Sequence, residues 1–288
     1  MNSLLSEIKY LARKSGLRPQ RQSGQNFLIN QKVLTEIIAS SDLSLDDRVL
    51  EIGAGFGTLT KELAQRVKKV WAVELEKRFI PSLKKMSFAF SAIEVIPNDI
   101  RKTNVGSLIG EKPYKIVANL PYNLTSYLLR KFLEQEPKPS LMVLLIQKEV
   151  AERITALPGS LSLLGVSVQF YAEPKIIQIV KSNDFWPEPA VDSAIVKIEK
   201  IKDERTVVSE LKRKSGISER DFFQVVRAGF SAKRKQIHNN LASSFHTNSE
   251  KIKKILELVG IDSKLRPQAL SVEDWKKLTA ILKQEKVL

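Results

Sequence analysis

The segment Asn119-Leu120-Pro121-Tyr122 brings an amide side chain, a proline and an aromatic ring together within four residues. These groups suit methyl transfer to the exocyclic amine of adenine, a poor nucleophile whose lone pair is delocalised into the ring. The Asn119 oxygen and the Leu120 carbonyl can accept the two amine hydrogens, which aims the nitrogen at an electrophilic methyl group and offsets the developing positive charge. The Tyr122 ring can stack on the base. The alternative is a tight strand-to-helix turn with a packing tyrosine.

The flanking residues predict where this segment lies. The apolar run 115–118 is typical of a short buried strand. Pro121 ends the strand because proline cannot donate to a strand ladder, and apolar residues at helical spacing follow over 128–133. We therefore expect the segment at the carboxyl end of a strand, the edge at which open α/β sheets bind ligands.

A glycine-rich turn and two acidic residues follow other predicted strands. The strand 49–52 runs into Gly53-Ala54-Gly55-Phe56-Gly57, whose glycines let the backbone approach a ligand closely. The strand 70–73 ends at Glu74, which can bind ribose hydroxyls, and the strand 93–96 precedes Asp99, which can accept from an adenine amine. The spacing G-x-G-x-G differs from the G-x-G-x-x-G of dinucleotide folds and favours S-adenosylmethionine over NAD. The alternative is two solvated acids at strand tips.

Further strands are predicted at 141–146, 176–180 and 194–198, with a helix over 148–155 between the first two. About seven strands with interleaved helices predict an α/β protein with one doubly wound, Rossmann-like sheet. The last two strands have too short a link for a crossover helix, so we expect the final strand to be antiparallel. Residues 207–288 show only helical periodicity. The expected parts are a basic N-terminal extension 1–24, a methyltransferase domain 25–203 and a helical RNA-binding domain 204–288.

The net charge of +15 predicts an anionic partner. It gathers at the ends of the chain, since residues 1–24 carry a net +4 and residues 203–288 hold 18 basic and 11 acidic residues. The most basic stretch runs from Ser231 to Leu241, and we expect Lys233, Arg234 and Lys235 to lie on a helix that contacts phosphates. Charge alone leaves DNA and an anionic membrane as alternatives, and a solvated basic face is another.

The rare residue types exclude several classes of site. The chain has no cysteine and two histidines, so it has no disulfide, thiolate metal site or cysteine nucleophile, and a histidine-based triad or metal site is not expected. No apolar run approaches the ~18 residues of a membrane span. We expect a cytoplasmic, monomeric protein without a metal.

The motifs together resemble the rRNA adenine N6,N6-dimethyltransferases, a class I methyltransferase family, from about Gln25 to Thr279. The residues Phe185 to Ser193 look like the family's F-x-P-x-P-x-V-D-S-A loop. The resemblance implies that Tyr122 and Phe185 sandwich the target adenine, next to Asn119, Leu120 and Pro121. It implies a cofactor site formed by Gln25, Asn26, Leu28, Gly53, Gly55, Glu74, Asp99 and Asn119.

The C-terminal residues discriminate within the family. The stretches 226–231, 239–241 and 266–271 are similar to the bacterial enzymes that act on the small subunit, and large-subunit methylases do not normally carry them. The resemblance therefore implies dimethylation of two adjacent adenosines in the 3′-terminal hairpin loop of 16S rRNA, in the immature small ribosomal subunit. The alternatives are a large-subunit (23S) rRNA methylase, a non-catalytic RNA-binding assembly or transcription factor, and a DNA methylase. One departure from the family pattern is Leu161, Leu163, Leu164 and Val166 in place of K-x-Y-G-x-L.

Overall fold

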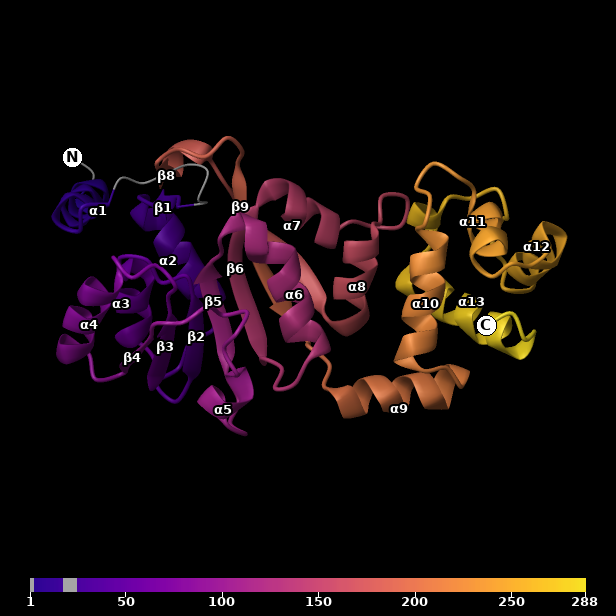
Figure 1. Ribbon diagram of the computed structural model, residues 1–288, viewed down its shortest axis with the longest axis horizontal. Coiled ribbons are helices and arrows are strands. Elements are labelled where there is room, and N and C mark those ends of the chain that lie inside the picture. The colour runs from indigo at the N-terminus through magenta and orange to yellow at the C-terminus, as the bar shows by residue number, and fades with distance from the viewer. Residues whose placement is uncertain (1–2, 18–24) are drawn as a thin grey trace. The chain divides into compact units, whose positions relative to one another are not determined.

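The computed structural model describes residues 3–17 and 25–288, and these form two compact units (Figure 1). The first unit holds the described residues up to Ala151 together with Glu173–Ile201. The second unit holds Glu152–Ala172 and Lys202–Leu288. Of the expected N-terminal extension 1–24, residues 1–2 and 18–24 lie outside the described residues. None of the described helices has the length and apolar character that crossing a bilayer requires.

A seven-stranded mixed sheet forms the centre of the first unit. Its strand order is β4-β3-β2-β5-β6-β9-β7. Strand β9 is antiparallel to both of its neighbours, and the other neighbouring pairs are parallel. The strands are β2 (Arg48–Ile52), β3 (Lys69–Val73), β4 (Ile93–Ile96), β5 (Lys115–Asn119), β6 (Leu141–Gln147), β7 (Glu173–Val180) and β9 (Ser193–Glu199). The predicted doubly wound sheet with one antiparallel strand is confirmed.

The strand order reverses direction at one place in this sheet. The chain runs outward from β2 to β3 and β4, then crosses to β5 on the other side of β2. Such a switch point leaves a crevice outside the carboxyl ends of the two central strands, because the connections leave in opposite directions. The turns after β2 and β5 are the glycine-rich turn and the Asn119–Tyr122 segment.

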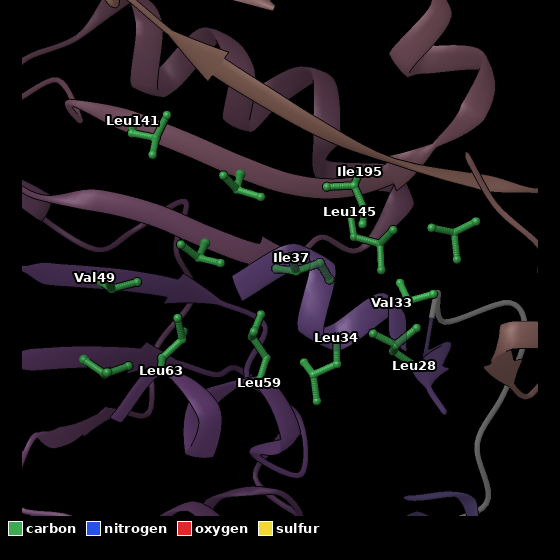
Figure 2. Close-up of a cluster of buried hydrophobic side chains, with 14 of the residues drawn as sticks. Leu28, Val33, Leu34, Ile37, Val49, Leu59, Leu63, Leu141, Leu145 and Ile195 are labelled. Carbon is green, nitrogen blue, oxygen red and sulfur yellow. The ribbon is translucent and has the colours of Figure 1, made fainter. Parts of the chain in front are cut away.

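Helices α2 and α3 cover one face of the sheet and close the main core (Figure 2). Val33, Leu34 and Ile37 of α2 are buried at 2% exposure or less, since they recur at helical spacing on one face. A second, two-stranded sheet pairs β1 (Phe27–Leu28) with β8 (Phe185–Trp186). The helices of this unit are α1 (Ser3–Lys14), α2 (Gln31–Ser40), α3 (Thr58–Ala64), α4 (Ile80–Ala89), α5 (Val105–Ile109), η2 (Tyr122–Leu124), α6 (Thr125–Glu134) and η3 (Ser182–Asp184); α7 (Lys148–Ile154) begins in it.

The second unit is helical, but it starts earlier in the chain than the expected boundary at residue 204. Residues 152–172 belong to it because Phe170 of α8 stacks on Phe222 of α10 with ring centroids 4.3 Å apart, and the Tyr171 hydroxyl donates to Glu219. The helices of this unit are α8 (Leu163–Tyr171), α9 (Glu204–Ser215), α10 (Glu219–Gly229), α11 (Ile237–Ser244), α12 (Ser249–Leu258), η4 (Pro267–Ala269) and α13 (Val272–Gln284).

The prediction that Lys233, Arg234 and Lys235 lie on a helix is wrong. Helix α10 ends at Gly229 and α11 begins at Ile237, so the three cations occupy the exposed turn between them. The Asn240 amide holds this turn, since Nδ2 donates to the backbone oxygens of Gly229 and Ala232. A long-range side-chain bond therefore overrides the local helix propensity of the basic residues.

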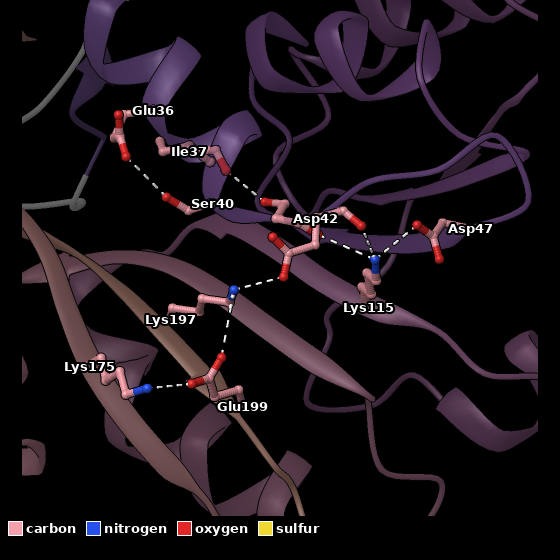
Figure 3. A network of polar contacts seen from close by, with 10 residues as sticks. Glu36, Ile37, Ser40, Asp42, Asp47, Lys115, Lys175, Lys197 and Glu199 are labelled. Atoms are coloured by element: carbon pink, nitrogen blue, oxygen red, sulfur yellow. Dashed lines mark hydrogen bonds and ion pairs between the residues drawn. The ribbon is translucent and has the colours of Figure 1, made fainter.

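Lys115 anchors the amino end of β5 in a polar network (Figure 3). Its Nζ donates to the Asp47 carboxylate at 2.9 Å and to the backbone oxygens of Ser41 and Asp42. Burial is the largest single effect and acts to raise the pKa of Asp47, but the interactions with Lys115 and Ser44 together outweigh it and lower that pKa. Lys115 thus joins β5 to the segment between α2 and β2.

Replacing Lys115 by methionine should lower the free energy of unfolding by about 1–3 kcal/mol, because three acceptors lose a charged donor. Urea denaturation of the two proteins measures the difference. The matched control is Lys175→Met, whose Nζ pairs with Glu199 while its side chain is 59% exposed. An exposed pair should contribute less than about 1 kcal/mol, so equal losses in both variants would contradict the anchoring role.

Candidate functional site

A cavity of about 510 Å³ lies at the switch point, at the carboxyl ends of β2, β3 and β5. It brings together residues from five separate parts of the first unit. Every expected cofactor residue lines it, namely Gln25, Asn26, Leu28, Gly53, Gly55, Glu74, Asp99 and Asn119. Leu120, Pro121 and Tyr122 line it as well.

The glycine-rich turn packs directly against the Asn119–Tyr122 segment. Gly53 has φ of +75°, and a Cβ placed there would lie 3.4 Å from Cδ of Pro121. Gly55 has φ of +56°, a left-handed conformation that side chains with a Cβ rarely adopt. These two positions therefore favour glycine because of their positive φ, and at Gly53 the backbone packs within van der Waals contact of the Pro121 ring.

Glu74 fixes the glycine-rich turn from the end of β3. Its Oε2 accepts from the Gly55 N–H at 2.8 Å and its Oε1 accepts from the Glu76 N–H at 2.7 Å. Burial raises the pKa of Glu74, and these backbone donors act against the rise. Each carboxylate oxygen keeps a further lone pair, so Glu74 can hold the turn and accept from ribose hydroxyls together.

Two buried polar atoms in the cavity wall lack a partner among the described residues. They are Oε2 of Glu51, on β2, and Oδ1 of Asn26. Burial, with a smaller contribution from the negative charge of Glu74, raises the pKa of Glu51 to about 8, although hydrogen bonding to Thr60 acts against the rise. Because unpartnered buried acceptors cost free energy, this wall fits a ligand that carries polar hydrogens.

Asp99 also lines the cavity and is paired with Arg101. The guanidinium donates through Nε and Nη2 to both carboxylate oxygens at 2.6–3.0 Å. Arg101 holds the pKa of Asp99 below its usual value, so this carboxylate is ionised at neutral pH. The Nζ of Lys131, on α6, fixes the same loop by donating to the backbone oxygens of Ile100 and Thr103.

The Asn119 side chain is oriented by the N-terminal segment of the cavity wall. Its Nδ2 donates to the backbone oxygen of Asn26 at 3.2 Å, so Oδ1 is the acceptor end of the amide. The next residue is fixed through its backbone, since the Leu120 N–H donates to the Leu145 oxygen of β6 at 3.1 Å. The segment therefore presents acceptors from a backbone that β6 holds.

Three aromatic rings form another wall of the cavity. Phe27, Phe56 and Phe79 line it, and the ring centroids of Phe56 and Phe79 lie 4.7 Å apart. Leu4 and Ile8 of α1 belong to the same cluster. The N-terminal helix thus supports this wall, a role that its isolated apolar spacing did not predict.

Phe185 does not join the other predicted residues at the cavity. Its ring is 3% exposed and belongs to the main hydrophobic core, and its backbone pairs with Leu28 in the β1–β8 sheet. The structure gives Phe185 a packing role, because a stack on a base requires its ring to leave that core. Phe185 is buried because apolar residues from other segments surround β8. The sequence of the loop 185–193 does not show those neighbours.

The donor set of the cavity fits S-adenosylmethionine. Glu74, Asp99, Gly53 and Gly55 all line the cavity, so carboxylate acceptors and a turn without side chains face the same space. The polar wall of Asn26 and Glu51 offers acceptors for an ammonium group. Sequence reasoning missed Arg101, Lys131 and the buried state of Glu51, because each depends on contacts between separate segments.

Comparison with known proteins agrees with this geometry. Residues 16–284 match the family model described as "Ribosomal RNA adenine dimethylase". The "Ribosomal RNA small subunit methyltransferase A" of Dehalococcoides mccartyi strain 195 is 40% identical over 97% of this chain and 94% of its own length. The protein of the same name from Clostridium botulinum strain Kyoto is 38% identical over 94% of this chain and 96% of its own.

Solved structures resemble the fold over most of the chain. A dimethyladenosine transferase from Plasmodium falciparum has a TM-score of 0.73 and 27% identity, covering 90% of this chain and 98% of its own. The 23S rRNA methyltransferase ErmE has a TM-score of 0.71 and 25% identity, covering 90% and 100%.

Glu51→Gln should stabilise the protein increasingly as the pH rises. The folded-state pKa of about 8 exceeds the ordinary 4.5, so ionisation of Glu51 opposes folding between those two values. The advantage of the glutamine variant should therefore grow from about pH 4.5 to about pH 8 and then level off. Urea unfolding of both proteins at pH 5 and pH 8.5 measures it, and a pH-independent difference would show that Glu51 ionises freely in the fold.

Proposed function

Because the chain belongs to the ribosomal RNA adenine dimethylase family, we propose that it dimethylates N6 of two adjacent adenosines in the 3′-terminal hairpin loop of 16S rRNA. The methyl donor is S-adenosylmethionine, and the reaction contributes to maturation of the small ribosomal subunit. The near full-length similarity to small-subunit methyltransferases supports the choice of subunit. A monomeric, cytoplasmic enzyme that acts on the immature subunit is part of the same proposal.

The orientation of Asn119 is the observation that carries the reaction type. With Nδ2 committed to Asn26, Oδ1 of Asn119 and the Leu120 carbonyl accept the two hydrogens of an adenine amine. The amine nitrogen then presents its lone pair toward the cavity, where the bound cofactor supplies a sulfonium methyl group. Positive charge that develops on N6 faces these two fixed dipoles, and Tyr122 holds the base by stacking. The base must leave its stack to reach the site.

Asn119→Ala should slow methyl transfer by ~10²–10³, because it removes one preorganised acceptor from the amine. Single-turnover methylation of 16S rRNA hairpin RNA, with cofactor and RNA saturating, measures the rate. Cofactor affinity by calorimetry should fall only modestly, since Glu74 and Asp99 remain. A variant that transfers methyl at the wild-type rate would contradict the proposed mechanism.

The substrate is tested by mapping N6-dimethyladenosine in both ribosomal RNAs of a deletion strain. Complementation with the wild-type gene should restore the modification at two adjacent adenosines of 16S rRNA, and the Asn119→Ala gene should not. Modification restored in 23S rRNA would favour a large-subunit enzyme. The absence of any modification difference would favour a non-catalytic RNA-binding factor.

The exposed turn of the second unit is the proposed RNA contact. Replacing Lys233, Arg234 and Lys235 by glutamine should weaken RNA binding and reduce the slope of log affinity against log salt by up to about 2–3, because fewer counterions are released. The control removes the same charge from α12 through glutamine at Lys251, Lys253 and Lys254. Equal slopes for the turn variant and the wild type would show that the turn does not contact RNA.

A further inference from the structure

Tyr122 makes a long-range hydrogen bond that the stacking role alone does not require. Its hydroxyl lies 2.7 Å from Oγ of Ser193, a residue 71 positions further along the chain. Ser193 is fully buried, at 0% exposure, whereas Tyr122 is half-buried at the cavity. The bond therefore joins a ring at the site to an atom inside the sheet.

Ser193 is a rigid anchor because its backbone belongs to the sheet on both sides. It pairs with Gln147 of β6 and with Val180 of β7. The preceding residue is also fixed, since the Asp192 carboxylate accepts from the Ser182 N–H at 3.1 Å and from Lys181 Nζ at 3.0 Å. The backbone oxygen of Asp192 accepts from the Lys148 N–H at 3.0 Å.

Tyr122 itself stands on a weaker support. It is the first residue of the short 3₁₀ helix η2, which has no side-chain cap. A ring on such a turn can reorient about its first side-chain torsion unless its far end is held. Because the backbone holds the Cα and Ser193 holds the hydroxyl, the long axis of the Tyr122 ring is fixed in one orientation.

We propose that Ser193 is a positioning residue for methyl transfer, which fixes the Tyr122 ring in the pose that stacks on the target base. This role rests on the proposed function and adds a residue to it. It also assigns a task to the hydroxyl of Tyr122, which stacking by the ring does not use. The serine of the loop 185–193 thereby couples that loop to the Asn119–Tyr122 segment.

A double-mutant cycle tests the coupling. Ser193→Ala and Tyr122→Phe should each slow single-turnover methylation about tenfold, because the loss of the same hydrogen bond misplaces the ring. The double variant should be no slower than either single variant, since the shared interaction is already gone. The dissociation constant of S-adenosylmethionine should stay within about twofold in all three proteins. Additive losses, or a wild-type rate in Ser193→Ala, would overturn the proposal.

Ser41→Ala is the matched control for loss of a buried hydroxyl. Ser41 is also at 0% exposure in the first unit and is not among the residues that line the cavity, and its Oγ donates to the backbone oxygen of Ile37 at 2.6 Å. This variant should lower the melting temperature and leave the methylation rate unchanged. Ser193→Thr retains the hydroxyl and should recover most of the rate that Ser193→Ala loses. A rate loss in Ser41→Ala equal to that in Ser193→Ala would show a general effect of destabilisation.

A measurement without RNA separates this proposal from the proposed function. In protein labelled with ¹³Cζ-tyrosine, the Tyr122 resonance is identified by its loss in Tyr122→Phe. It should shift in Ser193→Ala and stay unchanged in Ser41→Ala, because the phenolic carbon senses its hydrogen-bond partner. An unshifted resonance would refute the anchor even in an active enzyme. If the resonance shifts in Ser193→Ala but the wild-type protein methylates no rRNA, the proposed function is refuted and the Tyr122–Ser193 contact is retained.

Discussion

The close approach of two backbone turns is the constraint on which the rest of the site depends. The turns follow β2 and β5, which are parallel neighbours at the switch point of the sheet. They meet where Gly53, whose φ is +75°, packs against the Pro121 ring. The Glu74 carboxylate holds the glycine-rich turn through Gly55. This contact places the methyl donor's binding site and the acceptors for the amine in one cavity.

The residues at the strand ends that line this cavity are predictable because their signals are local, whereas the partners of Glu51 and Asp99 are not. An apolar run followed by an acid or an amide marks a strand and its end, which is how Glu74 and Asn119 were found. The two features whose positions the sequence predicted wrongly depend on contacts with residues outside their own segments. The basic turn exists because Asn240 holds it, and Phe185 is buried because β8 pairs with β1. The hydrogen bond between Ser193 and Tyr122 joins residues 71 positions apart, so no local sequence pattern predicts it.

Three acidic residues of the cavity carry out different electrostatic tasks. Glu51 is largely neutral at pH 7 because burial penalises its charge, whereas Asp99 is ionised beside Arg101. Glu74 is buried yet surrounded by backbone donors. The cavity wall thus combines a neutral carboxyl, a carboxylate paired with Arg101 and a carboxylate held by backbone N–H groups, within a protein that is strongly positive as a whole.

The pairing of β1 with β8 sets the order in which a newly synthesised chain completes its binding site. Phe27 and Leu28 leave the ribosome early, but their partners Trp186 and Phe185 follow much later. Closing so long a loop carries an entropic cost that only the assembled sheet can offset. The wall that contains Asn26 therefore forms after the strands that it covers. A nascent chain shorter than about residue 186 therefore has its glycine-rich turn but not the strand β8 that completes the β1–β8 sheet.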